Sequence, residues 1–210
     1  MKKLVLAFAA ILVALSAWAQ TPEEILEKMD KVMERGDTEG MIMTMTMKIP
    51  IIGAVPSRMY ILGDKSRAET QMLGQKLVIW EDATTTWTYD SKKNEVTIED
   101  NKANKSSDAD DTLGMLDGVA DGYDLKLQKE TADAWYIVCK KRKDNTNKDD
   151  PKKIEISVYK DSYLLKEMKA GVSGVSVIMN EVSFGVSEKD VIISEDILKN
   201  AVIVDNRKAE

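Results

Sequence analysis

The chain has 210 residues, with 36 acidic and 30 basic side chains, one cysteine and no histidine. This acidic balance disfavours binding to nucleic acid or to an anionic membrane surface, and the single cysteine, Cys139, excludes an intramolecular disulfide. The absence of histidine excludes Ser-His-Asp and Cys-His catalytic sites and removes the commonest zinc ligand.

The first 19 residues have the three parts of a secretory signal peptide. Lys2 and Lys3 are followed by an uncharged, mostly apolar stretch over residues 4–16 and by small residues around Trp18. The apolar stretch is shorter than a bilayer span of about 20 residues. No cysteine follows to carry a lipid anchor. We therefore expect cleavage after Ala19, export, and a single domain over residues 20–210.

A helix is predicted directly after the cleavage site. Thr21 and Glu24 form a capping box around Pro22, and apolar residues then recur at helical spacing until Gly36. Residues 22–35 are thus expected to form an amphipathic helix that docks through one apolar stripe.

The hydrophobic period changes from about 3.6 to 2 after Gly40. Every second residue is then a methionine, while Thr44, Thr46 and Lys48 occupy positions in between. Alternate residues of a strand point to opposite faces, and the charged Lys48 marks the outer one. We therefore expect the methionines to face the concave side of a sheet: Met41, Met43, Met45 and Met47.

Further strand patterns follow in two blocks, separated by a polar loop and a short helix near residues 109–120. A helical turn near residues 195–198 and a last strand at 202–204 close the chain. The predicted fold class is α+β, a strongly curved antiparallel sheet of about ten strands with both longer helices on its concave face. The expected strands cover residues 58–62, 65–72, 76–82, 85–90, 95–99, 123–129, 134–140, 153–159, 163–168 and 172–184.

The methionine strand is the main candidate for a binding site. Met is an unusual strand residue, and four in alternation give a flexible wall that can repack around apolar ligands. Ordinary core packing explains the pattern equally well, and both can hold if helices fill the cavity until a ligand displaces them. The expected apolar cavity adds aromatic and aliphatic residues of neighbouring strands and of the second helix: Val78, Trp80, Trp87, Tyr89, Val96, Ile98, Leu113 and Leu116.

Metal binding and catalysis are not favoured. The run of aspartates from Asp108 to Asp124 begins like a calcium loop, but Leu113 stands at the glycine position and Val119 at the twelfth. Paired carboxylates at 81–82 and 99–100 lie at strand ends, where acids are ordinarily solvated. We expect no enzyme activity, no metal and no other cofactor.

Several segments resemble the LolA-like family of periplasmic outer-membrane lipoprotein carriers. They are the initial helix with its Gly-led strand, and residues 65–69 (KSRAE), 77–82 (LVIWED), 86–90 (TWTYD), 153–159 (KIEISVY) and 201–207 (AVIVDNR). The resemblance implies an incomplete β-barrel, closed by helices, whose apolar cavity shields lipoprotein acyl chains. It also implies a periplasmic monomer that receives cargo from an inner-membrane ABC transporter and delivers it to an outer-membrane acceptor.

One departure concerns the lid. The family has a cavity Arg-Pro pair on an early strand, and the corresponding residues 60–64 contain neither. The lid must then close differently, or the ligand is another lipid. The alternative function is a non-catalytic envelope domain for protein interaction or sensing, which a fully packed core would favour.

Overall fold

The computed structural model describes residues 20–101, 122–148, 150–172 and 175–207. The predicted signal peptide, the second helix near residues 109–120, and the candidate residues Leu113 and Leu116 lie outside these ranges. No helix among the described residues is both long enough and apolar enough to cross a bilayer.

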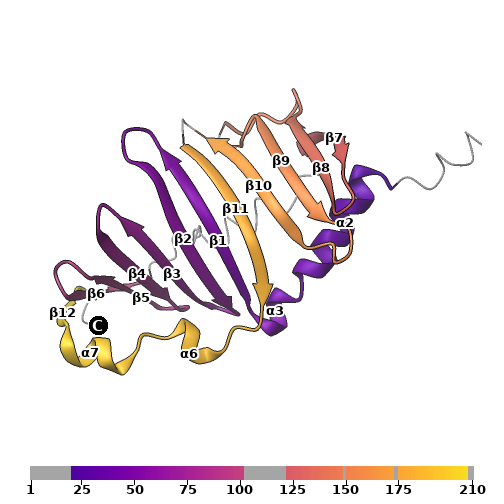
Figure 1. Ribbon diagram of the computed structural model, residues 1–210. Coiled ribbons are helices and arrows are strands. Elements are labelled where there is room, and N and C mark those ends of the chain that lie inside the picture. The colour runs from indigo at the N-terminus through magenta and orange to yellow at the C-terminus, as the bar shows by residue number, and fades with distance from the viewer. Residues whose placement is uncertain (1–19, 102–121, 149, 173–174, 208–210) are drawn as a thin grey trace, which may run out of the picture.

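Twelve strands form one sheet, in the order β12-β6-β5-β4-β3-β2-β1-β11-β10-β9-β8-β7 (Figure 1). The strands are β1 (Met41–Ile49), β2 (Gly53–Leu62), β3 (Lys65–Met72), β4 (Gln75–Glu81), β5 (Thr85–Asp90), β6 (Glu95–Asp100), β7 (Tyr123–Glu130), β8 (Ala134–Lys141), β9 (Lys153–Tyr159), β10 (Leu165–Val172), β11 (Val175–Phe184) and β12 (Val202–Asp205). The described helices are α2 (Pro22–Met33), α3 (Gly36–Glu39), α6 (Glu188–Val191) and α7 (Glu195–Asn200).

The sheet is a meander that is joined in its middle by the pairing of β1 with β11. All strand pairs are antiparallel except β12 with β6, which is parallel. Strands β12 and β7 stand at the two ends of the order, so the sheet does not close into a barrel. The predicted incomplete barrel is confirmed, with twelve strands in place of about ten.

The strand connections use residues that tolerate a left-handed backbone. Gly63 and Gly74 have φ values of 58° and 76° in the β2–β3 and β3–β4 turns. Leu73, beside Gly74, also has a positive φ of 52° and is 86% exposed. Short turns of this kind keep consecutive strands adjacent and set the cross-strand register.

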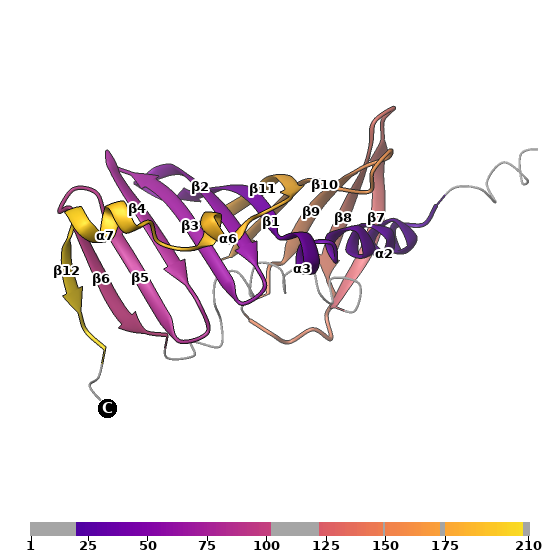
Figure 2. The same ribbon diagram turned by 90° about the horizontal axis from the view of Figure 1, so that it is seen from below.

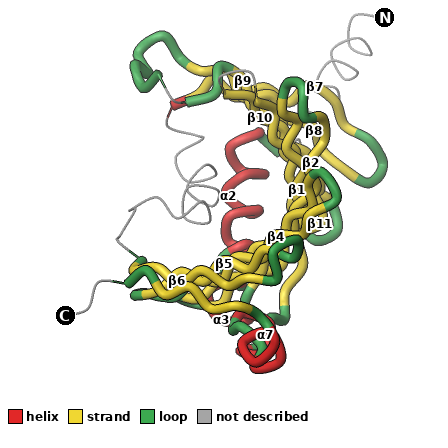
Figure 3. Tube along the Cα trace, turned by 90° about the vertical axis from the view of Figure 1, so that its left-hand side faces the viewer, coloured by secondary structure: helices red, strands yellow, loops and turns green. Residues whose placement is uncertain are grey.

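The helices lie on different sides of the curved sheet. Seen along the sheet, α2 lies inside its curve, whereas α7 lies outside (Figure 3). The smaller helix α6 contacts β2 and β3, and the C-terminal segment continues past α7 to β12 (Figure 2). The predicted position of the first helix on the concave face is therefore confirmed.

Candidate functional site

Along β1, the alternating methionines are more deeply buried than the residues between them. Met41, Met43 and Met45 are 2%, 0% and 8% exposed, whereas the intervening Thr44 is half-buried and Lys48 is exposed. The predicted orientation of the methionines is confirmed for these three residues. Met47, near the end of the strand, is only half-buried and lies outside the core cluster.

Helix α2 covers these methionines. Its capping box is formed as predicted, because the Glu24 N–H donates to Thr21 Oγ1 at 3.2 Å and the Thr21 N–H donates to Glu24 Oε2 at 3.2 Å. The apolar stripe of the helix is buried against the sheet, and it consists of Ile25, Leu26, Met29 and Met33.

Methionine dominates the contact between helix and sheet. Eight of the described methionines belong to one buried cluster, two from α2 and six from four strands. Cross-strand pairs link five of the six, since Met43 pairs with Met59, Met45 with Met179, and Met179 with Met168. We call the six strand residues the inner methionine face: Met41, Met43, Met45, Met59, Met168 and Met179.

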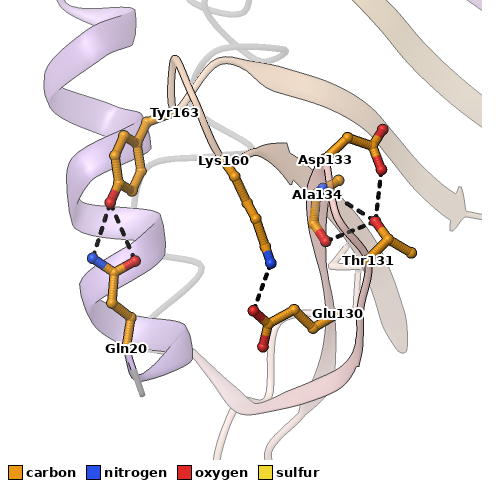
Figure 4. A network of polar contacts seen from close by, with 7 residues as sticks. All are labelled: Gln20, Glu130, Thr131, Asp133, Ala134, Lys160 and Tyr163. Atoms are coloured by element: carbon orange, nitrogen blue, oxygen red, sulfur yellow. Dashed lines mark hydrogen bonds and ion pairs between the residues drawn. The ribbon is translucent and has the colours of Figure 1, made fainter. Parts of the chain in front are cut away.

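Few polar contacts hold the start of α2 on the described part of the sheet. The Gln20 side-chain amide exchanges hydrogen bonds of 2.9 and 3.2 Å with the Tyr163 hydroxyl (Figure 4). The Lys28 ammonium lies 3.4 Å from the same hydroxyl and 5.1 Å from the ring centroid. Tyr163 in turn packs on Trp135, with ring centroids 5.3 Å apart. The residue has a strained φ of 55°, in the turn between β9 and β10.

The remaining described candidates lie on the opposite face of the sheet, and this corrects the prediction of one continuous wall. Cross-strand partners share a face, and Met59 pairs with Ala68, which pairs with Ile79. The neighbours of Ile79 in sequence therefore point outward, as do their own partners on β5 and β6. We call these residues the outer apolar face: Val78, Trp80, Trp87, Tyr89, Val96 and Ile98.

The outer apolar face is a second buried layer. Val78, Trp80, Val96 and Ile98 are at most 8% exposed, while Trp87 and Tyr89 are half-buried. The C-terminal segment crosses the outer side of the sheet through α6. There Glu188 pairs with Lys65 at 2.8 Å, and Val191 is 2% exposed. Whether any residue of either face binds a ligand remains a prediction.

Arg58 and Arg67 are also on the outer side. Arg67 pairs in register with Trp80, lies 3.9 Å from the Tyr60 ring centroid and is 3.2 Å from Glu69. Arg58 pairs in register with Thr44, the outward-facing neighbour of Met43. Neither guanidinium therefore takes the place of a cavity arginine that would tether α2.

A shallow depression of about 300 Å³ lies on the outer side of β1 to β4. Glu69 lies inside it and pairs with Lys76 at 3.1 Å. Its lining is mostly polar or charged, which does not suit an acyl chain, and consists of Thr44, Pro56, Ser57, Arg58, Glu69, Thr70, Gln71 and Lys76.

The described residues contain no cluster of metal ligands and no activated thiol. Among them, no three acidic or cysteine side chains gather in a way that would hold a metal ion. Burial raises the pKa of the Cys139 thiol to about 12, so this cysteine is an inert core residue. Asp82 accepts hydrogen bonds from the Thr84 and Thr85 N–H groups, each at 2.8 Å, and so stabilises a turn.

Comparison with solved structures finds this architecture elsewhere. An uncharacterized conserved protein of Thermus thermophilus matches with a TM-score of 0.50 and 16% identity, over 89% of this chain and all of that one. The MucA/MucB complex of Pseudomonas aeruginosa gives a TM-score of 0.45 and 12% identity, over 81% of this chain and 61% of the other. A LolA superfamily protein of Nitrosomonas europaea gives 0.32 and 10%, over 85% and 100%.

At sequence identities of 16% or less, a structural match shows a shared fold and nothing about function. No protein-family model matches the chain, and the search among curated proteins finds no match. The open sheet of this chain is itself the incomplete barrel predicted from the sequence, and a LolA superfamily protein is among the structures that it resembles.

Proposed function

We propose that this chain binds acyl chains between α2 and the inner methionine face, and that it carries lipid-modified proteins or other lipids across the periplasm. The contact is closely packed, with Met29 and Met43 at 1% and 0% exposed, as the protein-interaction alternative also expects. The observation that carries the proposal is therefore the concentration of methionines at this one contact. Unbranched, polarizable Met side chains repack around apolar groups of different shapes. Binding by burial alone requires no catalytic group, and we propose none.

Either α2 or an acyl chain could cover the inner methionine face. Burial of either one contributes a similar free energy, which suits reversible binding. The four buried side chains of α2 contribute about 6–12 kcal/mol if each contributes about 1.5–3 kcal/mol. An acyl chain of about 15 methylenes gains about 12 kcal/mol at about 0.8 kcal/mol per methylene. A ligand of this size can therefore replace α2 on the inner methionine face, and α2 can replace it again.

The polar contacts between the start of α2 and Tyr163 are compatible with a role of the helix as a lid. Its contacts with Tyr163 come from Gln20 and Lys28, near the helix start. The bond from Gln20 is partly buried and contributes about 0.5–1.5 kcal/mol, whereas the bond from Lys28 is exposed and contributes less. The resemblance to LolA-like carriers adds the partners to the proposal, namely an inner-membrane ABC transporter as donor and an outer-membrane acceptor.

A fluorescent fatty-acid probe tests the proposal on matched variants of residues 20–210. Met45→Asp places a carboxylate on the inner methionine face, while Thr46→Asp places it one residue further on the outer side. We expect at least tenfold weaker probe binding for Met45→Asp and less than a twofold change for Thr46→Asp, because a buried unpaired charge is costly.

Thermal unfolding of both variants serves as the folding control. Met45→Gln, which is closer in shape, replaces Met45→Asp if the aspartate variant does not fold. Equal probe binding by the folded inner and outer variants would contradict the proposal, as would a wild-type chain that binds no acyl probe.

A further inference from the structure

Strand β12 forms an edge of the sheet that no other described strand covers. It is the last strand in the sheet order, and its only partner among the described strands is β6. Val202 and Ile203 are 60% and 43% exposed, although both are large and apolar. β-branched residues in sequence favour the extended conformation, so the strand is also well formed for pairing.

The direction of the backbone groups follows from two hydrogen bonds. The Val202 N–H donates to the Asn94 carbonyl at 2.9 Å, and the Asn206 N–H donates to the Ile98 carbonyl at 2.8 Å. Backbone N–H groups alternate in direction along a strand. The N–H and C=O of Ile203, and the N–H of Asp205, therefore point away from β6 toward the open edge.

The opposite edge of the sheet, β7, is built differently. Its exposed side chains include Asp124, Lys126, Lys129 and Glu130. Charged residues on an edge strand are the ordinary means by which proteins prevent unwanted strand pairing. In β12 the one charged residue is Asp205, at the strand end, and its carboxylate is held by Arg207 at 2.6 Å.

We propose that the open edge of β12 binds an extended, apolar peptide segment of a partner protein by strand addition. Main-chain hydrogen bonds would come from Ile203 and Asp205, and side-chain contacts from Val202 and Ile203, which lie on opposite faces of the strand. This site is separate from the acyl-chain site and does not depend on the proposed function.

A second copy of this chain fits the edge less well than a peptide. Strand β12 has four residues, and stable protein interfaces bury about 1,200–2,000 Å² in total. Pairing two such short edges between rigid domains falls short of that area. A flexible peptide can follow β12 and continue onto neighbouring exposed surface, such as Leu198 of α7.

The probe is a fluorescein-labelled peptide with the sequence of residues 94–101, because β12 already pairs with this strand in β6. Its three acidic residues, Glu95, Glu99 and Asp100, are replaced by threonine so that the probe is uncharged, like the proposed apolar ligand. Binding is followed by fluorescence anisotropy. Ile203→Pro removes the outward N–H and leaves the bonds of Val202 and Asn206 to β6 intact. We expect at least tenfold weaker binding for Ile203→Pro. Ile192→Ser, which alters an isoleucine that is 48% exposed outside the strand, should change binding less than twofold.

N-methylated peptides test the same point on the unaltered protein. Methyl groups on the N–H groups of one peptide edge should abolish binding, while methyl groups on the other edge should leave it within twofold, since only one edge faces β12. The proposal is overturned if both methylated peptides bind like the parent, if Ile203→Pro binds like wild type, or if wild type does not bind the probe. It is also overturned if the chain alone forms a dimer that Ile203→Pro abolishes.

Discussion

The two apolar layers of this molecule differ in composition and in what covers them. The inner methionine face is lined by flexible side chains and lies under α2, whose attachment includes few polar bonds among the described residues. The outer apolar face consists of aromatic and β-branched residues, and the C-terminal segment crosses its side of the sheet before ending in strand β12.

The two coverings also differ in what must break before they can leave the sheet. A helix at one end of the chain can leave the sheet without breaking any strand pairing. The C-terminal segment cannot leave without breaking the β12–β6 ladder and the Lys65–Glu188 ion pair. This contrast is the reason for proposing ligand exchange at the inner methionine face and a stabilising role for the outer apolar face.

The largest effect on stability is expected at Gly40, which lies between α3 and β1 and against Val186 of the C-terminal segment. Gly40 has a φ of 67°, and an added Cβ would lie 2.6 Å from Val186 Cβ and 2.8 Å from the Ile61 carbonyl oxygen. Gly40→Ala should lower the free energy of unfolding by about 3 kcal/mol or more through strain and overpacking, as measured by urea unfolding.

Gly74→Ala is the matched control. Gly74 has a φ of 76°, but its added Cβ would meet no atom within 4 Å. Only the backbone strain of about 1 kcal/mol should then appear. Equal losses for the two variants would show that the junction at Gly40 is not tightly packed.

A smaller effect is expected at the attachment of α2. Tyr163→Phe removes the hydroxyl that Gln20 and Lys28 contact and keeps the ring that packs on Trp135. Stability should fall by about 1 kcal/mol or less. Hydrogen exchange should become faster in α2 and remain unchanged in β12. Unchanged exchange in α2 would mean that apolar packing alone holds the helix.

The smallest effect concerns pH. The Lys166 ammonium, 2.6 Å away, and the Thr131 hydroxyl lower the pKa of Asp133 from its ordinary 3.8 to about 2. A carboxyl pKa that is lowered in the folded state stabilises above the unfolded value, and that contribution is lost as pH falls from about 4 to 2. Lys166→Met should raise the Asp133 pKa toward 3.8.

Asp205 serves as the internal reference in the same NMR titration of carboxyl groups. Its pKa is also lowered to about 2, by Arg207 on the other edge of the sheet, and should not change in Lys166→Met. A shift of both carboxyl groups would mean that the substitution acts through the whole fold.

The capped helix and the methionine face of β1 could be predicted because their signals are local. Thr21, Pro22 and Glu24 lie within one turn, and the alternation in β1 is complete within eight residues. The contributions of Met168 and Met179 could not be predicted in this way. They reach the cluster through long-range pairing, with register shifts at Ile42–Thr44 and Leu165–Glu167.

The sequence analysis also did not predict that the apolar residues of β4 to β6 lie on the outer side of the sheet, opposite to the methionines of β1. The segment Leu77-Val78-Ile79-Trp80 is apolar at every position, so its period does not indicate which side is inward. The choice depends on the register with β3 and on the C-terminal segment, which is more than 100 residues away in sequence. Neither is visible in the segment itself.

The most direct test uses the tryptophans as reporters of the two faces. Over residues 20–210 the chain has Trp135 in the buried cluster under α2, and Trp80 and Trp87 on the outer apolar face. A double variant, Trp80→Phe with Trp87→Phe, leaves the inner reporter, and Trp135→Phe leaves the outer ones. A brominated fatty acid quenches tryptophan on contact. We predict strong, saturable quenching of Trp135 and little quenching of Trp80 and Trp87, and the reverse pattern, or none at all, would contradict the account.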